Sequence, residues 1–300
     1  MLEKPTLVKI KTMEKIEIVV RENCYLGENP LWNPFDRHLY WTDINRGQLY
    51  CFSPSGQVYQ RCYQGETVGG FTLQADGSFL LFTAGPAVKI WRENRITPLI
   101  ENIPDEKNSR FNDVIADAAG RVFCGTISPD RSPGNLYRLE TGGTLRKLLG
   151  GLLCSNGMGF SPDQKYFYLT DSGKGTIYRF HYHAETGDIS NQEVFIKVPP
   201  EEGVPDGLTV DAEGYLWSAR YNGGCVCRYS PDGQIVSRLR LPVRKVTSVT
   251  FGGEEYRDLY ITTAGGNQPE STSRSDGYLF RFLRAGRGLP EFFSRVGHQG

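Results

Sequence analysis

The sequence lacks the features that mark membrane-spanning, nucleic-acid-binding and disulfide-stabilised proteins. Among its 300 residues, 34 basic and 34 acidic side chains leave a formal net charge of zero, so no excess of positive charge predicts a nucleic acid or a membrane surface as a partner. No stretch approaches the roughly 20 apolar residues that a membrane-spanning helix needs. The seven cysteines are odd in number and scattered, which favours reduced thiols over a disulfide framework.

We expect no signal peptide at the N-terminus. Its residues MLEKPTLVKIKTMEKIEIVV alternate charged side chains with single apolar ones and contain no continuous apolar run of the length that a signal peptide needs. We therefore expect a cytoplasmic protein. We expect a single domain over residues 1–300, in which residues 1–14 form an N-terminal extension.

Helical periodicity is missing as well, and an internal repeat takes its place. Six segments can be laid over one another: ENPLWNPFD from 28, GGFTLQADG from 69, NDVIADAAG from 112, NGMGFSPDQ from 156, DGLTVDAEG from 206 and TSVTFGGEE from 247. Their first residues lie 41, 43, 44, 50 and 41 positions apart. Each segment is followed by a second alternating strand, such as HLYWTDI or KYFYLTD. Five of the six then lead clearly to a third, such as GQLYCFSP or GTIYRFHY, and the sixth, AVKIWREN, is a looser match.

Four short strands in each unit of about 43 residues, with Gly, Pro and Asp at the turns, are typical of propeller blades. The repeat therefore predicts an all-β, six-bladed β-propeller with four antiparallel strands per blade. The segments EKIEIVV and LPEFFSRV are left over at opposite ends of the sequence. We expect these N- and C-terminal strands to pair in one blade, because that pairing closes the ring and removes an open edge.

The innermost strand of each blade runs along the central channel, so one repeat position from all six blades converges on the axis. The residues at that position are Glu28, Gly69, Asn112, Asn156, Asp206 and Thr247. Five of the six carry a side-chain oxygen, whereas the next positions on the same strands are mostly apolar: Leu31, Phe71, Val114, Leu208 and Val249. Buried carboxylates without a partner are costly. The ring therefore predicts a bound ion at one mouth of an apolar channel.

Carboxylate and amide oxygens are the ligands that Ca²⁺ prefers. The ring contains no His or Cys, the usual ligands of Zn²⁺, although an oxygen-only site also accepts Zn²⁺, Mn²⁺ or Mg²⁺. Asn and Asp before Gly have another common explanation, because they are frequent turn residues that bond their own backbone. Asn156 and Asp206 are thus either ion ligands or turn residues, and their shared register with Glu28 favours ligands.

Motifs for other catalytic machinery are not found. The sequence contains no nucleophile elbow, zinc-protease helix or phosphate-binding Gly loop. No histidine lies near the ring positions to activate a Ser or Cys nucleophile.

Several motifs together resemble the senescence marker protein, gluconolactonase and LRE-like family, the regucalcin-like sugar lactonases. They are YLGENPLW, RFNDVIADAAGRVFCGTI, SNGMGFSPD, VPDGLTVDAEGYLWSARYNGG and LPVRKVTSVTFGGEEYRDLYIT. The resemblance covers about residues 15 to 295. It implies a six-bladed propeller that holds one divalent cation and hydrolyses aldonolactones such as gluconolactone.

The resemblance also implies roles for particular residues. It assigns metal ligation to Glu28, Asn156 and Asp206, with Asp206 also the base, and substrate binding to Arg110 and Asn112 of RFND. An acidic substrate contact falls on Asp130. Two departures concern the substrate: Val114 and Ile115 follow RFND where relatives often have Gly and Lys, and the stretch SPDRSPG is short compared with the lid loop of the animal proteins. Asp113 is either a further site residue or a strand-start turn residue.

The resulting hypothesis is a metal-dependent lactonase whose partner is a small sugar lactone. Two alternatives stay open: a hydrolase of other activated esters such as phosphotriesters, and a non-catalytic calcium-binding propeller that regulates other proteins. Arg110 beside the ring favours an enzyme, since a guanidinium weakens cation binding but helps to hold a polar substrate.

Overall fold

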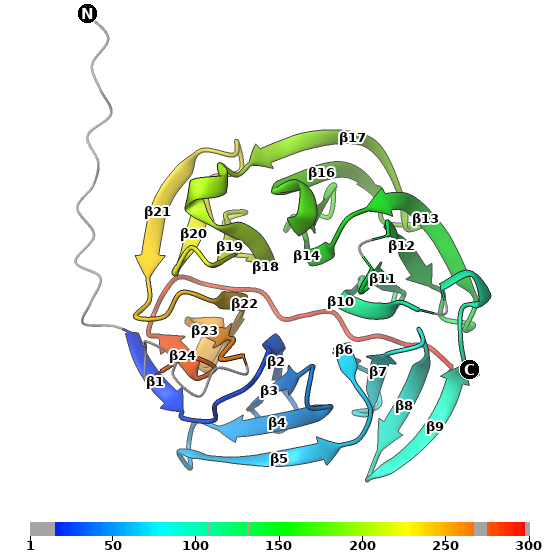
Figure 1. The fold of residues 1–300 in the computed structure, drawn as a ribbon, viewed down its shortest axis with the longest axis horizontal. Helices are drawn as coiled ribbons and strands as arrows, with labels where there is room; N and C mark the ends of the chain where they lie inside the picture. The colour runs from blue at the N-terminus through cyan, green and yellow to red at the C-terminus, as the bar shows by residue number, and fades with distance from the viewer. Residues whose placement is uncertain (1–15, 107, 131, 267–274, 298–300) are drawn as a thin grey trace, which may run out of the picture.

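The chain forms a ring of sheets around a central channel in the computed structural model (Figure 1). The structure describes residues 16–106, 108–130, 132–266 and 275–297, so the expected N-terminal extension, residues 1–14, lies outside the described residues. Within these ranges there are six antiparallel sheets of four strands each, as the repeat predicts. The seven cysteines are free thiols, in agreement with their odd number.

Each sheet is a blade, and in five blades the strands follow in chain order from the channel outwards. Blade 1 contains β2 (Gly27–Asn33), β3 (His38–Asp43), β4 (Gln48–Ser53) and β5 (Val58–Gln64). Blade 2 contains β6 (Val68–Leu73), β7 (Phe79–Thr83), β8 (Val88–Arg92) and β9 (Arg95–Ile100). Blade 3 contains β10 (Arg110–Ala116), β11 (Val122–Ile127), β12 (Gly134–Leu139) and β13 (Leu145–Leu152).

The second half of the ring repeats this plan. Blade 4 contains β14 (Ser155–Phe160), β15 (Tyr166–Asp171), β16 (Thr176–His183) and β17 (Asp188–Lys197). Blade 5 contains β18 (Val204–Val210), β19 (Leu216–Tyr221), β20 (Cys225–Tyr229) and β21 (Ile235–Arg240). Blade 6 contains β22 (Val246–Gly252), β23 (Asp258–Thr263), β24 (Leu279–Phe282) and β1 (Ile16–Val20). Short 3-10 turns lie at Pro104–Glu106, Ser172–Lys174, Pro200–Glu202 and Glu254–Tyr256.

The ring is closed in blade 6 by strands from the two ends of the chain. β1 pairs antiparallel with β24, with Ile16 opposite Phe282. The predicted closure of the ring is therefore confirmed. The predicted partner of the N-terminal strand is wrong, because β1 pairs with residues 279–282 and not with LPEFFSRV. That last segment leaves the blade because its backbone and aromatic side chains find partners over the channel.

Residues 287–297, here called the C-terminal strap, cross the channel from blades 5 and 6 to blades 2 and 3 (Figure 1). At one end Ala212 N–H donates to the carbonyl of Arg287 (2.8 Å), and at the other Ser294 N–H donates to the carbonyl of Leu73 (2.9 Å). Phe292 packs against Phe160, with ring centroids 6.4 Å apart. The strap thus covers the mouth where the inner strands end, and the predicted ring of polar residues lies at the opposite mouth.

All six inner strands break their pairing register near the point where they begin. The irregularities fall at Glu28/Leu31, Val68/Gly70, Phe111/Val114, Asn156/Met158, Pro205/Leu208 and Val246/Ser248. A β-bulge inserts an extra residue and changes the direction in which neighbouring side chains point. The repeated bulge therefore lets polar side chains face the axis while the rest of each strand stays apolar.

The glycines after Asn156 and Asp206 show that these residues do not form turns. Both dipeptides lie inside strands, in β14 and β18. A Cβ at Gly157 would lie 2.4 Å from the backbone nitrogen of Leu208, and one at Gly207 would lie 2.0 Å from Ser248 Oγ. These positions are glycine because adjacent inner strands approach closely there.

Apolar side chains fill the space between neighbouring blades. Phe82 of blade 2 packs edge-on against Phe111 of blade 3, with centroids 5.3 Å apart, and both are fully buried. Each blade buries both faces in this way, which explains why the inner strands read as nearly continuous apolar segments after their first residues.

A polar ring at one mouth of the channel

Four of the predicted ring residues come together as buried polar side chains on four inner strands. They are Glu28 on β2, Asn112 on β10, Asn156 on β14 and Asp206 on β18, and each is at most 8% exposed. The amide of Asn156 donates a hydrogen bond to the carboxylate of Asp206, and the charges of Glu28 and Asp206 act on one another. Side chains that are far apart in the sequence therefore form one site.

The surroundings of the two ring carboxyls, Glu28 and Asp206, disfavour their charged forms. Burial, followed by repulsion from Asp206 and Asp113, raises the pKa of Glu28 well above its ordinary value of 4.5. Burial and the charge of Asp113 likewise raise the pKa of Asp206 well above 3.8, although Asn156 and Arg110 act in the opposite direction. Removing a carboxylate from water disfavours its charged form. The site is therefore suited to a bound cation.

Asn156 is held in place by three contacts. Its amide nitrogen donates to Ser172 Oγ (3.2 Å) as well as to Asp206, and its oxygen accepts the N–H of Gly157 (3.1 Å). For Asn156 to bind a cation, the amide must turn over so that its oxygen faces Asp206 and Glu28. The hydrogen bond between Asn156 and Asp206 would then be replaced by a cation that both side chains bind.

Arg110 and Asn112 form a second polar group beside the carboxylates. Arg110 Nη1 donates to Asn112 Oδ1 (2.6 Å) and to the carbonyl of Phe111 (2.9 Å). Asn112 in turn donates to the carbonyl of Ser155 (2.8 Å). Burial lowers the pKa of Arg110, whereas the charges of Glu28 and Asp206 raise it. The amide of Asn112 thus bonds the protein through both its oxygen and its nitrogen, and substrate binding by Arg110 and Asn112 stays a prediction.

Blades 2 and 6 do not extend the polar ring. A Cβ at Gly69 would lie 1.9 Å from the carbonyl oxygen of Phe111, so this position has no room for a side chain. Thr247 is fully buried, and its hydroxyl bonds the carbonyl of Gly27 and the hydroxyl of Thr262. The hydroxyl of Thr247 thus links blade 6 to blade 1. The bulge in β22 brings Ser248 to face the channel in its place.

Asp130 lies away from this group, on an exposed loop after β11. Its carboxylate accepts hydrogen bonds from Ser128 Oγ (2.6 Å) and Ser132 Oγ (2.6 Å), which lower its pKa to about 2. It lines an open groove with Glu106 and Asn135. The structure places no contact between Asp130 and Arg110 or Asn112, and its role in substrate binding stays a prediction.

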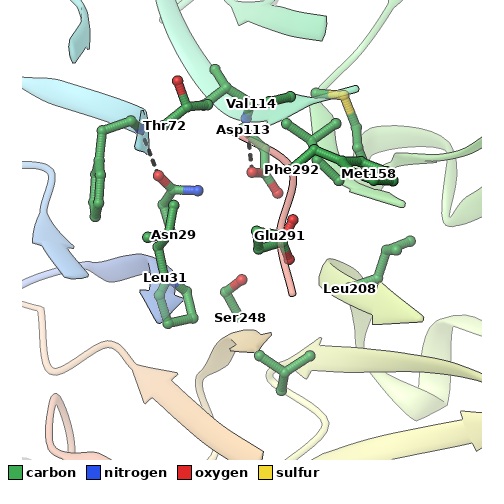
Figure 2. A pocket seen from close by; sticks show the side chains of 15 residues that line it. Asn29, Leu31, Thr72, Asp113, Val114, Met158, Leu208, Ser248, Glu291 and Phe292 are labelled. Carbon is green, nitrogen blue, oxygen red and sulfur yellow. Dashed lines mark hydrogen bonds between the residues drawn. The ribbon is translucent and has the colours of Figure 1, made fainter. Parts of the chain in front are cut away.

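Asp113 faces an inner chamber, between the polar ring and the strap (Figure 2). There it meets Glu291 of the strap, which sequence reasoning missed because residues 289–296 were interpreted as a blade strand. The sequence signal for this position is a single carboxylate among the apolar residues LPEFF. Burial raises the pKa of Asp113 to about 7, and burial and Asp113 raise the pKa of Glu291 to about 7.

The donor set of the ring fits a hard cation. Two carboxylates and one amide oxygen from Glu28, Asp206 and Asn156 supply the oxygen ligands that Ca²⁺ uses. In the part of the chain that the structure describes, no three His, Cys, Asp or Glu side chains gather in a metal-binding group. The class defined by fold and site is therefore a six-bladed propeller with an oxygen-rich, cation-compatible pocket at its axis.

Comparison with known proteins gives the family. Residues 26–265 match the SMP-30/Gluconolactonase/LRE-like region, and the chain belongs to this family. It is 43% identical to the pentonolactonase XacC of Haloferax volcanii, over 93% of this chain and 97% of the relative. It is 35% identical to the regucalcin of Oryctolagus cuniculus, over 93% and 97% of the two chains.

A solved structure shares the whole architecture. The calcium-binding protein regucalcin from Agrobacterium tumefaciens superposes with a TM-score of 0.88 at 24% identity, over 93% of this chain and 97% of that one. At this identity the likeness concerns the fold alone. Among the described residues, no helix is both long enough and apolar enough to span a membrane.

Proposed function

We propose that the chain is a divalent-cation-dependent hydrolase that opens sugar lactones. The observation that carries the proposal is the pair of buried carboxyls, Glu28 and Asp206, whose pKa values are raised beside Arg110 and Asn112. The pentonolactonase relative supports the same reaction and makes pentonolactones the first substrates to test.

Glu28, Asn156 and Asp206 would hold the cation, with Ca²⁺ the first choice and Zn²⁺, Mn²⁺ or Mg²⁺ as alternatives. When bound, such a cation polarises the lactone carbonyl and stabilises the negative charge that develops on its oxygen. The same cation offsets the repulsion between the two carboxylates.

Asp206 serves as the base in this proposal. Its carboxylate accepts a proton from the water whose oxygen attacks the carbonyl carbon. The ring C–O bond then breaks, and the proton passes to the departing oxygen, which gives the open hydroxy acid. Because a raised pKa brings a carboxylate nearer to the pH at which it exchanges protons, the environment of Asp206 suits this task.

Arg110 and Asn112 would hold the sugar hydroxyls. Their mutual hydrogen bond keeps the guanidinium and the amide in one fixed arrangement, which lowers the entropy cost of orienting the substrate. Asp130 would add a contact from the rim if its loop turns inward on substrate binding.

The direct test is a pH-indicator assay of purified protein against pentono- and hexonolactones, with EDTA and metal add-back in parallel. We expect turnover that EDTA abolishes and one divalent cation restores. Faster hydrolysis of paraoxon-like esters than of any lactone would favour the activated-ester alternative. Cation binding without turnover on any ester would favour the regulatory propeller.

A further inference from the structure

Two cysteines of blade 5 lie side by side on one strand. Cys225 and Cys227 occupy alternate positions of β20, so their side chains share one face of the sheet. Their sulfurs are 3.8 Å apart, and the residues are 6% and 1% exposed. β20 lies between β19 and β21 (Figure 1). The two thiols are thus enclosed in the blade and close enough to react with one another.

A buried guanidinium lies on the same strand face of the blade. Arg220 of β19 is directly opposite Cys225 and is fully buried. Within the described ranges its hydrogen bonds go to neutral groups, which are the hydroxyl of Ser218, the carbonyl of Ala219 and the hydroxyl of Tyr229. Its Nε is buried and has no hydrogen-bond partner in the described part of the chain. A buried positive charge of this kind is costly unless an anion lies nearby.

The thiolate of Cys227 supplies that negative charge. A hydrogen bond from Cys225 lowers the pKa of Cys227 below its ordinary value of 9.0, although burial opposes this effect. The charges of Arg220 and Arg238 also lower this pKa, whereas the charge of Glu202, which is paired with Arg238, raises it. The same hydrogen bond raises the pKa of Cys225. Blade 5 therefore holds one thiolate, on Cys227, beside one protonated thiol, on Cys225.

We infer that Cys225 and Cys227 are a peroxide-reactive thiol pair, in which Cys227 is the nucleophile and Cys225 closes a reversible disulfide within β20. The thiolate sulfur of Cys227 attacks one oxygen of the peroxide, the O–O bond breaks, and hydroxide leaves while Cys227 becomes a sulfenic acid. The sulfur of Cys225 then attacks the sulfur of Cys227, the S–O bond breaks, and the hydroxyl group leaves as water with the proton of Cys225. The two sulfurs together lose two electrons, which reduce the peroxide to hydroxide and water.

Burial and spacing determine the reagent and the product. Sulfurs as enclosed as these admit a water-sized oxidant such as H₂O₂ more readily than a bulky disulfide. Alternate residues of a strand lie roughly 6.6 Å apart, at about 3.3 Å per residue, which is near the upper end of the Cα spacing that disulfides span. A strained disulfide is easily reduced. Its formation also removes the negative charge beside Arg220, which favours return to the dithiol. The inference does not depend on the proposed lactonase activity.

Peptide mapping after peroxide treatment tests the pair. Trypsin releases residues 221–228, YNGGCVCR, as one peptide that contains both cysteines and no other. The reduced wild type is treated with a small molar excess of H₂O₂, unfolded, alkylated with iodoacetamide and digested. We expect this peptide to lose the mass of two hydrogens and to take up no label, and we expect dithiothreitol to restore both labels. The thiol of Cys124, which is fully buried and whose pKa burial raises, is the internal control and should stay labelled.

Three variants separate the roles of the two sulfurs. Cys225→Ser should accumulate a Cys227 sulfenic acid that dimedone traps, because no thiol remains to close the disulfide. Cys227→Ser should leave Cys225 reduced under the same treatment, because the attacking thiolate is gone. Cys62→Ser, which removes a thiol of blade 1, is the matched control and should form the disulfide as the wild type does.

Two results would overturn the inference. One is a wild-type peptide 221–228 that stays fully labelled, or that gains oxygen without forming a disulfide. The other is oxidation of Cys225 in Cys227→Ser to the same extent as in the wild type, which would remove the role of Cys227 as nucleophile. The wild-type mapping decides the first point even if a variant does not fold.

Discussion

The two mouths of the central channel are assembled from different kinds of residue. Where the inner strands begin, Glu28, Asn112, Asn156 and Asp206 occupy one repeated position in four blades. Where the strands end, a single non-repeated segment crosses the opening and contributes Glu291 (Figures 1 and 2). A repeat thus brings equivalent residues to the axis at one mouth, whereas a non-repeated terminal segment covers the other mouth of the channel.

This difference suggests that the two mouths tolerate substitution differently. At the repeated mouth, changes to the polar side chains that face the channel should alter chemistry with little effect on folding. Changes where backbones of neighbouring inner strands touch should alter folding first.

The largest effect is expected at Asp206. Asp206→Asn keeps the shape of the side chain but removes the proposed base and one carboxylate, so kcat/KM should fall by about 10² or more, the scale of general-base catalysis. The lactone assay with saturating metal measures this loss. Asp232→Asn, at an exposed turn, is the matched control, and near-normal turnover of metal-loaded Asp206→Asn would contradict the proposed role.

Gly69→Ala tests the close approach of β6 and β10. The added Cβ would lie 1.9 Å from the carbonyl oxygen of Phe111, so one inner strand must move, at a cost of about 1–3 kcal/mol of unfolding free energy. Denaturant unfolding measures the change. Gly77→Ala is a useful comparison, since a Cβ there meets no atom within 4 Å, although its positive φ adds some strain; equal losses in the two variants would argue against the contact.

Arg110→Lys tests whether Arg110 positions the substrate or takes part in the chemical step. A lysine keeps the charge but loses the planar donor group that bonds both Asn112 and the Phe111 carbonyl. We expect KM for the lactone to rise about tenfold, with a smaller change in kcat, because positioning is lost and the base is retained. Steady-state kinetics measure both constants, and a loss confined to kcat would place Arg110 in the chemical step instead.

Glu106 supports the loop that precedes Arg110, and its titration predicts a pH effect. Burial alone would raise its pKa, but hydrogen bonds from Ser109, Asn135, Tyr137 and Thr126 lower the pKa below its ordinary 4.5. The folded state therefore favours the carboxylate, so this stabilisation is present above about pH 4.5 and is lost as the pH falls through the lowered pKa.

The variant Glu106→Gln should accordingly be less stable than wild type at pH 7, by about 1–3 kcal/mol for a hydrogen-bonded charged group. The difference should shrink as the pH falls below about 4. Thermal unfolding of both proteins across this range measures it, and a pH-independent difference would assign the effect to packing.

The smallest effect is expected at Asp130. Its carboxylate is exposed and already accepts hydrogen bonds from Ser128 and Ser132, so Asp130→Asn should change kcat/KM less than about threefold, the range of a replaceable surface contact. A much larger loss, seen only in KM, would show that the loop turns inward when substrate binds.

Most of the fold could be predicted because each blade repeats the same alternation of apolar and polar residues. Glu28, Asn156 and Asp206 could be singled out for the same reason, since equivalent positions must meet at the axis. Thr247 was misplaced by one position: counting along the repeat does not reveal that a bulge at Val246/Ser248 directs Ser248 to the channel. Glu291 was missed because its segment does not repeat.

The order of residues by itself determined the number of blades, the strands within them and the four polar positions at one mouth, since these follow from periodicity. Only the tertiary structure decided that Asn156 bonds Asp206, that the glycines beside them let neighbouring inner strands approach closely, and that the last residues cover the channel and bring Glu291 near Asp113. Such contacts join segments far apart in the chain, so they depend on the closed ring and not on any local pattern.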